Sequence, residues 1–339
     1  MKSIETFIFI LLMVLTTGCQ LPRTEPTFPF EHYAKLVPHD LELCVKENRG
    51  NFNILTLSGG AGNGAWGAGM LSQWVEQDHD VIVGVSTGAL MSSLVYVKDY
   101  THLKTAFTTT NNTDIFDIPV RNPLTMTSIS TDRAITKTVE RYCSNETIDQ
   151  IAQEYIKTRR LLLTVSTDLD TGRVMVWNMG KIACRKDYEL YRKVVVSSAS
   201  IPILFPPQEI NGHFFVDGGA RTNVWVSDEL LKLCPKNTNV YIVLNLMPSK
   251  TGEGKTPNSL GGISTRSIHL LIDSVTIGNV EYIRKLGLKY GIPIHVGQPA
   301  EGTPLVDIEF IPEQMTKLWD CGETWGRKPN WSNDIDFPY

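Results

Sequence analysis

Short apolar runs alternate with amphipathic segments along most of the chain. Four runs have the length and the β-branched or aliphatic character of buried strands: Ile54 to Leu57, Val81 to Val83, Leu161 to Val165 and Val240 to Leu244. Apolar residues recur at helical spacing after a predicted Thr147/Gln150 capping box and again around Ile268 to Val275. This alternation predicts an α/β layered domain with a mainly parallel sheet.

The first residues have a different pattern. Lys2 precedes an apolar run from Phe7 to Leu15, which is followed by Thr-Thr-Gly-Cys19. A membrane-spanning helix needs roughly 20 apolar residues, so this shorter run is typical of a secretory signal. Small residues directly before a cysteine resemble the lipobox of bacterial lipoproteins. We therefore expect residues 1–18 to be a signal peptide and Cys19 to carry lipid, the alternative being an ordinary cleaved signal with an incidental cysteine.

The rest of the chain divides by composition. Residues 19–50 contain several prolines and no sustained periodicity, which is typical of a tether. Residues 51–325 are expected to form the folded domain, and residues 326–339 a C-terminal tail. The five cysteines after Cys19 allow up to two disulfides or none.

The composition of the chain argues against some classes of function. The 339 residues are 42% hydrophobic and 20% charged, as in ordinary globular proteins. A formal net charge of −4 argues against a nucleic-acid partner, because nucleic-acid-binding proteins carry a basic surplus. Cysteines and histidines are not clustered, so no metal site is predicted. Asp168 and Asp170 are expected to be turn residues before a strand at Arg173 to Trp177.

Ser86 is the candidate catalytic nucleophile. It is the central residue of Gly84-Val85-Ser86-Thr87-Gly88, between a predicted strand and a helical pattern. This context fits a nucleophile elbow, in which a sharp turn exposes the serine hydroxyl above a sheet. The pentapeptide alone occurs by chance in roughly one chain in ten of this length, and a glycine-rich packing turn is the competing interpretation.

A glycine-rich segment, Gly59 to Gly69, precedes Ser86 and also follows a strand. Its consecutive backbone amides form a site for negative charge. A phosphate-binding Walker loop is excluded, because Asn63-Gly64-Ala65 supplies neither the lysine nor the hydroxyl. We therefore expect an oxyanion hole on the strand next to that of Ser86.

Asp217 is the candidate base. It ends a predicted strand and is followed by Gly218 and Gly219, which leave room for another group to approach the carboxylate. A carboxylate in a dehydrated pocket becomes more basic than the usual pKa of about 3.9 and can accept a hydroxyl proton. Taken alone, Asp-Gly-Gly is more often a turn.

Together, the three elements resemble the patatin-like phospholipases, which carry an anion loop, G-x-S-x-G and D-G-G/A in this order. The resemblance covers about residues 50 to 325 and extends to Asn223. It implies a three-layer α/β/α fold and a Ser-Asp dyad, with Ser86 as nucleophile and Asp217 as base. It also implies an oxyanion hole at Gly59, Gly60, Ala61 and Gly62, no cofactor, and a membrane lipid or lipid-like ester as substrate.

The sequence departs from the family pattern at three positions. Ala61 replaces the third glycine of the anion loop, Asn63 stands where many members have arginine, and Trp225 stands where a proline often follows the asparagine. Without the arginine, the sequence gives no cation for a phospholipid headgroup. Acyl ester hydrolysis is therefore the firmer expectation, and phospholipid specificity stays open.

Two alternatives remain. A Ser-His-Asp triad could use His269 or His295, because both follow Asp217 in the chain as α/β-hydrolase order requires. A non-catalytic envelope lipoprotein could keep the fold without the activity. In either case, Gln20 after Cys19 resembles outer-membrane sorting in enteric bacteria. We therefore expect a lipid-anchored protein of the bacterial cell envelope, in the outer membrane and facing the periplasm.

Overall fold

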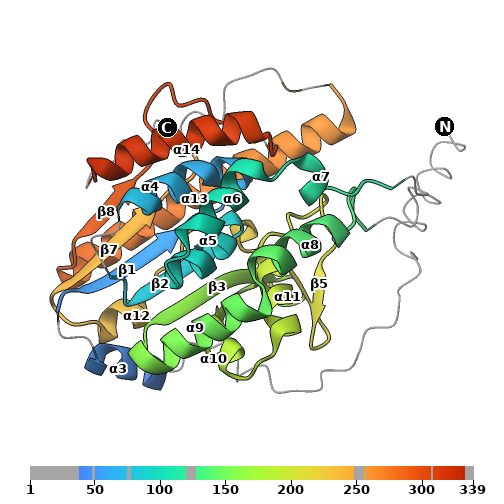
Figure 1. Cartoon of the computed structure of the whole chain (residues 1–339). Coiled ribbons are helices and arrows are strands. Elements are labelled where there is room, and N and C mark those ends of the chain that lie inside the picture. Colours follow the sequence, from blue (N-terminus) through green and yellow to red (C-terminus); the bar gives the residue numbers. More distant parts are fainter. Residues whose placement is uncertain are drawn as a thin grey trace, which may run out of the picture.

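The computed structural model describes residues 38–47, 50–74, 78–119, 127–247, 256, 258–306 and 308–332 (Figure 1). The predicted signal peptide, Cys19 and most of the predicted tether lie outside these residues. Within the described part, no helix is both long enough and apolar enough to cross a membrane.

The centre of the molecule is an eight-stranded sheet in the order β5-β6-β3-β2-β1-β7-β8, with β4 paired to β3. The strands are β1 (Phe52–Leu57), β2 (Val81–Val85), β3 (Leu161–Asp168), β4 (Arg173–Asn178), β5 (Gln208–Ile210), β6 (His213–Asp217), β7 (Thr238–Val243) and β8 (Ile294–Gly297). The four predicted apolar runs are confirmed as β1, β2, β3 and β7. Their burial on both faces explains why they are continuously apolar.

The sheet is mostly parallel, as expected. β3, β2, β1, β7 and β8 pair in parallel, in that order. The antiparallel pairs are β3 with β4, β3 with β6, and β5 with β6. All three antiparallel pairs lie at the end of the sheet beyond β2.

Helices cover both faces of the sheet, which gives the expected three layers (Figure 1). One face packs against α4 (Gly64–Gln73), α5 (Thr87–Tyr96), α6 (Tyr100–Thr109), α8 (Arg133–Tyr142), α9 (Asn145–Thr158), α10 (Met179–Cys184), α11 (Tyr188–Ser198) and α14 (Pro312–Arg327). The other face packs against α3 (Pro38–Glu47), α12 (Asp228–Leu233) and α13 (Leu260–Tyr290). The short helix α7 (Asn112–Ile115) connects α6 to the segment before α8.

Two helix boundaries differ from the sequence-based expectation. Helix α9 begins one turn before the predicted capping box, because Ser144 is its N-cap and accepts a hydrogen bond from the Thr147 amide. The sequence does not predict helix α3, since its residues lie in the proline-containing segment that is expected to be a tether. Leu41 and Cys44 hold it to the body of the protein by packing into the second core.

The C-terminal residues also pack on the body. Helix α14 continues to Arg327, and Ser332 forms a β-bridge with Val296. The ring of Trp331 lies 4.7 Å from that of Trp74 and 5.0 Å from that of Trp325. The described cysteines after residue 37 are all unpaired: Cys44, Cys143, Cys184, Cys234 and Cys321.

Candidate active site

Ser86 lies at a sharp turn between β2 and α5. Its backbone has φ 55° and ψ −124°, a strained conformation for a residue with a side chain and one that projects the side chain from the turn. The turn requires its two glycines. A Cβ atom on Gly84 would lie 2.3 Å from the carbonyl oxygen of Gly88, and one on Gly88 would lie 2.4 Å from the carbonyl oxygen of Leu57.

Sheet register brings Asp217 to Ser86. One edge of β3 is occupied by β4 from Leu163 to Asp168, so β2 and β6 must share the other edge. There β2 ends at Val85 opposite Val165, while the antiparallel β6 ends at Asp217 opposite the next residue, Ser166. The carboxyl ends of β2 and β6 therefore meet head to head, with the residue after one strand beside the last residue of the other.

Asp217 is 3% exposed, and its environment has opposing effects on its pKa. Burial raises the pKa of the carboxyl group because the charged form loses hydration. Hydrogen bonds from the Ser86 side chain and the Gly219 amide lower the pKa by stabilising the charged form. The net effect is a pKa raised to about 7. The carboxylate is therefore a much stronger base than an exposed aspartate.

The anion loop follows β1, which pairs directly with β2, so its predicted position on the neighbouring strand is confirmed. Within the loop, the Gly59 amide donates to Asn223 Oδ1 at 2.9 Å and is therefore not free for an oxyanion. Among the described residues, the structure shows no acceptor for the amides of Gly60, Ala61 and Gly62. Of these three, Gly60 and Ala61 line a cavity with Ser86.

Asn223 holds this loop from the opposite layer. Its amide Nδ2 donates to Thr276 Oγ1 on α13 at 2.8 Å, and its backbone amide donates to Asn279 Oδ1 at 2.9 Å. The site therefore has a rigid connection to α13. Sequence reasoning noted Asn223 only through the family resemblance and did not find Thr276 or Asn279, because no local motif marks them.

Asn63, at the position where many family members have arginine, has a structural role. Its Nδ2 donates to the Val306 carbonyl at 2.7 Å, and its Oδ1 accepts from the Val306 amide at 2.8 Å. Both polar atoms of the side chain thus bond to the backbone of one residue 243 positions away. Asn63 therefore joins the anion loop to the cavity wall and does not offer a charge to a substrate.

Ser198, near the end of α11, supports the elbow. Its hydroxyl accepts a hydrogen bond from the Ser86 amide at 2.9 Å and donates to the Val165 carbonyl at 2.6 Å. This bridge joins the nucleophile turn to β3, the strand that pairs with Asp217 of β6. The family resemblance extends to the segment from Ser197 to Pro207, which contains Ser198, but it predicts no role for this residue.

Two cavities meet at Ser86. The polar cavity, so named for Asp217 and Asn223 on its wall, also includes Gly60, Ala61 and apolar side chains such as Leu246 and Ile272. The apolar cavity is walled mainly by aliphatic and aromatic side chains from α5, α6, α8 and the neighbouring segments. Ala61, Ser86, Ile201 and Ile308 line both cavities.

The two candidate histidines lie in different places. His269, on α13, lines the polar cavity with Ser86 and Asp217. His295, on β8, stacks on Tyr241 with ring centroids 4.8 Å apart and is not among the residues that line either cavity. The structure therefore brings His269, but not His295, to the site.

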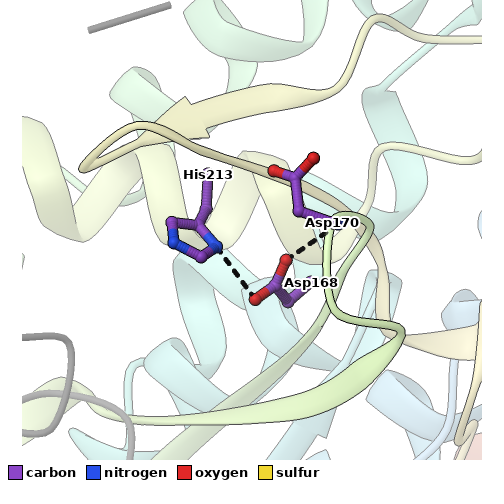
Figure 2. A group of neighbouring side chains, drawn as sticks. All are labelled: Asp168, Asp170 and His213. Atoms are coloured by element: carbon purple, nitrogen blue, oxygen red, sulfur yellow. Dashed lines mark hydrogen bonds and ion pairs between the residues drawn. The ribbon is translucent and has the colours of Figure 1, made fainter. Parts of the chain in front are cut away.

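Asp168, Asp170 and His213 form a separate cluster, whose nitrogen and oxygen atoms lie within 4.8 Å of one another (Figure 2). Asp168 Oδ1 accepts from the amides of Asp170 and Thr171, and its Oδ2 lies 3.1 Å from His213 Nδ1. Asp170 Oδ2 accepts from the Phe214 amide at 2.9 Å. These bonds hold the β3–β4 turn against the start of β6, in agreement with the predicted turn role.

The family model for patatin, described as patatin-like phospholipase, matches residues 55–229, just over half of the chain. No curated protein matches the sequence. The crystal structure of VipD from Legionella pneumophila matches with 12% identity and a TM-score of 0.44, over 81% of this chain and 66% of the VipD chain. Because the family model covers more than half of the sequence, including Ser86 and Asp217, the chain belongs to the patatin-like phospholipase family, whose general activity is lipid acyl hydrolysis.

Proposed function

We propose that this protein is a membrane-anchored serine hydrolase that cleaves fatty acyl esters of lipids. Ser86 is the nucleophile and Asp217 is the general base. The backbone amides of Gly60 and Ala61 form the oxyanion hole, with Gly62 next to them in the same loop. The proposed steps use only groups of the chain itself.

One observation carries this proposal: Ser86 and the buried Asp217, whose pKa is raised to about 7, line one cavity where the carboxyl ends of β2 and β6 meet. A serine hydroxyl is a poor nucleophile unless a neighbouring base takes its proton. A general base works best when its pKa is close to the working pH, and Asp217 meets this condition near neutrality.

The geometry supports two chemical half-reactions. As Ser86 Oγ attacks the ester carbonyl carbon, its proton passes to Asp217 and the carbonyl oxygen becomes an oxyanion. Unpaired amides on the cavity wall can donate to that oxyanion, and loss of one such donor typically lowers the rate about 100- to 1,000-fold. Asp217 then protonates the leaving alcohol. In the second half-reaction, Asp217 takes a proton from water, which attacks the acyl carbon. The bond to Ser86 Oγ then breaks, Asp217 returns the proton to Ser86 Oγ, and the fatty acid leaves.

The second cavity favours a fatty acyl group over a small one. It begins at Ser86, and its wall is almost entirely apolar, with Phe107, Phe116, Phe205 and Phe310 among its residues. Burying a hydrocarbon chain there is favoured by the hydrophobic effect. The polar cavity, on the side of the anion loop, is left for the leaving alcohol.

Membrane anchoring is the remaining part of the proposal. Its support is the lipobox-like Thr-Thr-Gly-Cys19 sequence, together with a family activity directed at lipid esters. Lipid on Cys19 would hold the active site close to a bilayer. We accordingly propose a location in the bacterial cell envelope, most simply the outer membrane facing the periplasm.

The direct test combines active-site labelling with product analysis. Wild type, Ser86→Ala and Asp217→Asn are incubated with a fluorophosphonate probe and, separately, with a panel of phospholipids, lysophospholipids and simple esters. We expect wild type to be labelled and to release fatty acid, and both variants to lose turnover by a factor of at least about 1,000. Equal turnover by Ser86→Ala would refute the nucleophile. Absence of labelling and turnover in the wild type would favour a non-catalytic lipoprotein.

A Ser-His-Asp triad remains a second candidate, because His269 lines the same cavity as Ser86. Replacing His269 with alanine distinguishes the two mechanisms, and His295→Ala is the matched control away from both cavities. If the Ser-Asp dyad is correct, His269→Ala still reacts with the fluorophosphonate probe at Ser86 and still forms the acyl-enzyme with an ester. Loss of acyl-enzyme formation in His269→Ala alone would establish the triad.

A further inference from the structure

The described part of the chain buries four aspartates, and two of them lie at the active site. Asp40 pairs with Lys181 at 2.6 Å, and Asp168 holds the β3–β4 turn, so both have structural roles outside the two cavities. Asp217 is the proposed base. Asp273, on α13, is 5% exposed and lines the polar cavity, but the proposed reaction steps do not use it.

The helical spacing of α13 turns Asp273 toward this cavity. His269, Ile272 and Asp273 are three and four residues apart, so they share one face of the helix, and all three line the cavity. Thr276, the next residue on that face, accepts a hydrogen bond at 2.8 Å from Asn223, which also lines the cavity. Asp273 therefore lies on the cavity wall one helical turn from the bond that fixes α13 at the active site.

The leaving alcohol of an ester would enter the cavity that Asp273 lines. The acyl chain is assigned to the apolar cavity, so the group beyond the ester oxygen occupies the polar one. A carboxylate has two oxygens with about four acceptor positions, so it can accept hydrogen bonds from substrate hydroxyls in addition to bonds within the protein. Two neighbouring hydroxyls of one alcohol can bond to its two oxygens.

A phosphate on the alcohol would meet the opposite situation. Among the described residues, the side chains on the wall of the polar cavity that can carry a charge are Asp217, His269 and Asp273. Two of these three are acids. Like charges repel more strongly in a site that holds little water than they do in bulk solvent. The charge of Asp273 therefore favours an uncharged alcohol with free hydroxyls over one that carries phosphate.

We propose that Asp273 selects the leaving alcohol, and that fatty acyl esters of an uncharged polyol such as glycerol are preferred over phospholipids. This inference rests on the proposed function, because it requires Ser86 as the nucleophile and the acyl chain in the apolar cavity. Asp273 accepts hydrogen bonds from the free hydroxyls of the polyol, and its charge disfavours a phosphate in the same place. Its role is to determine specificity, and it takes no proton in the reaction.

The test keeps the acyl chain constant and changes only the alcohol. Propyl decanoate, 1-decanoylglycerol and 1-decanoylglycerol 3-phosphate compete in one reaction below their micelle-forming concentrations, and mass spectrometry follows the loss of each ester. All three esters form the same acyl-enzyme, so the ratios of kcat/KM report the effect of the alcohol. We expect wild type to prefer the glycerol ester by about tenfold or more over the propyl ester and over the phosphate ester.

Asp273→Asn keeps the shape of the side chain and removes its charge, so both ratios should fall by about fivefold or more. Asp40→Asn is the matched control, because it removes an aspartate of the same 5% exposure and changes the net charge equally, but outside both cavities. Both ratios should persist in this control.

The wild-type ratios test the inference even if a variant folds poorly. A propyl ester or a phosphate ester that wild type cleaves as fast as the glycerol ester would overturn the inference and leave the hydrolase proposal intact. Ratios that are the same in Asp273→Asn as in wild type would also overturn it.

Failure of the hydrolase proposal has a different signature, because wild type would then cleave none of the three esters. Calorimetry with the ether analogues 1-O-decylglycerol and 1-O-decylglycerol 3-phosphate tests the cavity in that case. Tighter binding of the uncharged ether by wild type, lost in Asp273→Asn, would support selection of the alcohol by Asp273. Equal affinities for the two ethers, or the same difference in Asp273→Asn, would overturn it.

Discussion

At Asp217, the same burial that raises the carboxyl pKa also makes the group useful near neutral pH. The carboxylate must be deprotonated to take the Ser86 proton, and its pKa is raised to about 7. Activity is therefore expected to be low in acid and to rise with pH through about 7. An exposed aspartate would give the same rise near pH 4.

The pH dependence of kcat/KM for a soluble acyl ester checks this expectation, because that profile reports the pKa of the essential base in the free enzyme. Asp217→Asn serves as the variant without the titrating group. A wild-type profile that is flat between about pH 5 and pH 8 would contradict the assignment of Asp217 as a base with a pKa near 7.

The raised pKa of Asp217 also predicts how stability varies with pH. The pKa is about 7 in the folded protein and about 4 in the unfolded chain, so the folded state binds more protons between these values. The free energy of unfolding should therefore fall as pH rises from about 4 to about 7. Since one pKa unit corresponds to about 1.4 kcal/mol, the total loss is up to about 4 kcal/mol.

Asp217→Asn removes this titration, because asparagine stays neutral. We expect the variant to be more stable than wild type above about pH 7 and to approach wild-type stability near pH 4. Urea unfolding of both proteins across this range measures the difference. A constant offset between the two stability curves would show that ionisation of Asp217 has no linkage to folding.

At the scale of elements, the catalytic pair depends on how three strands meet. The strands β2 and β6 share one edge of β3, and their carboxyl ends meet at Val165 and Ser166. The bridge from the Ser86 amide through Ser198 to the Val165 carbonyl then fixes the elbow on this edge. Ser86 and Asp217 therefore belong to one rigid arrangement even though 131 positions separate them in the sequence.

Local pattern predicted the parallel part of this arrangement. Continuous apolar runs indicated β1, β2, β3 and β7, and glycines after two of them indicated the loop and the elbow. The shared edge of β3 could not be predicted, because strand pairing depends on contacts between distant residues. The same reason hid the bonds of Asn63 to Val306 and of Asn223 to α13.

The anion loop should lose its position when Asn223 is removed. Asn223→Ala leaves the buried Gly59 amide without its acceptor and removes the donor to Thr276 Oγ1, which keeps its own bond to the Ile272 carbonyl. We expect kcat to fall about tenfold or more and the free energy of unfolding to fall by about 1–3 kcal/mol. Asn239→Ala on β7 is the matched control, because the side chain of Asn239 makes two long hydrogen bonds of 3.4 Å, to Asn53 and His295.

Steady-state kinetics and urea unfolding on the same preparations separate the two effects of Asn223→Ala. A variant that is less stable but keeps wild-type kcat would show that Asn223 supports the fold and not the position of the loop. Loss of kcat with KM nearly unchanged is the result expected when an oxyanion hole moves, since its donors act mainly in the transition state.

At the scale of the whole molecule, the folded domain supplies the chemistry, and the N-terminal segment is proposed to supply the location. The three-layer domain contains both cavities. A lipid on Cys19 is the proposed attachment to the membrane. Bacterial lipobox cysteines carry more than one acyl chain, and two chains hold a protein on a membrane far more firmly than one.

Cys19→Ser should therefore release the protein from membranes while leaving the domain active. Metabolic labelling with a fatty acid, followed by fractionation of cells, compares wild type with Cys19→Ser. The matched control is Cys321→Ser, because Cys321 is an exposed, unpaired thiol on α14 of the same chain. We expect label and membrane association to be lost only in Cys19→Ser, with hydrolysis of a soluble ester retained in the released protein. Label on Cys19→Ser, or its loss in Cys321→Ser, would place the anchor elsewhere and remove the basis for an outer-membrane location.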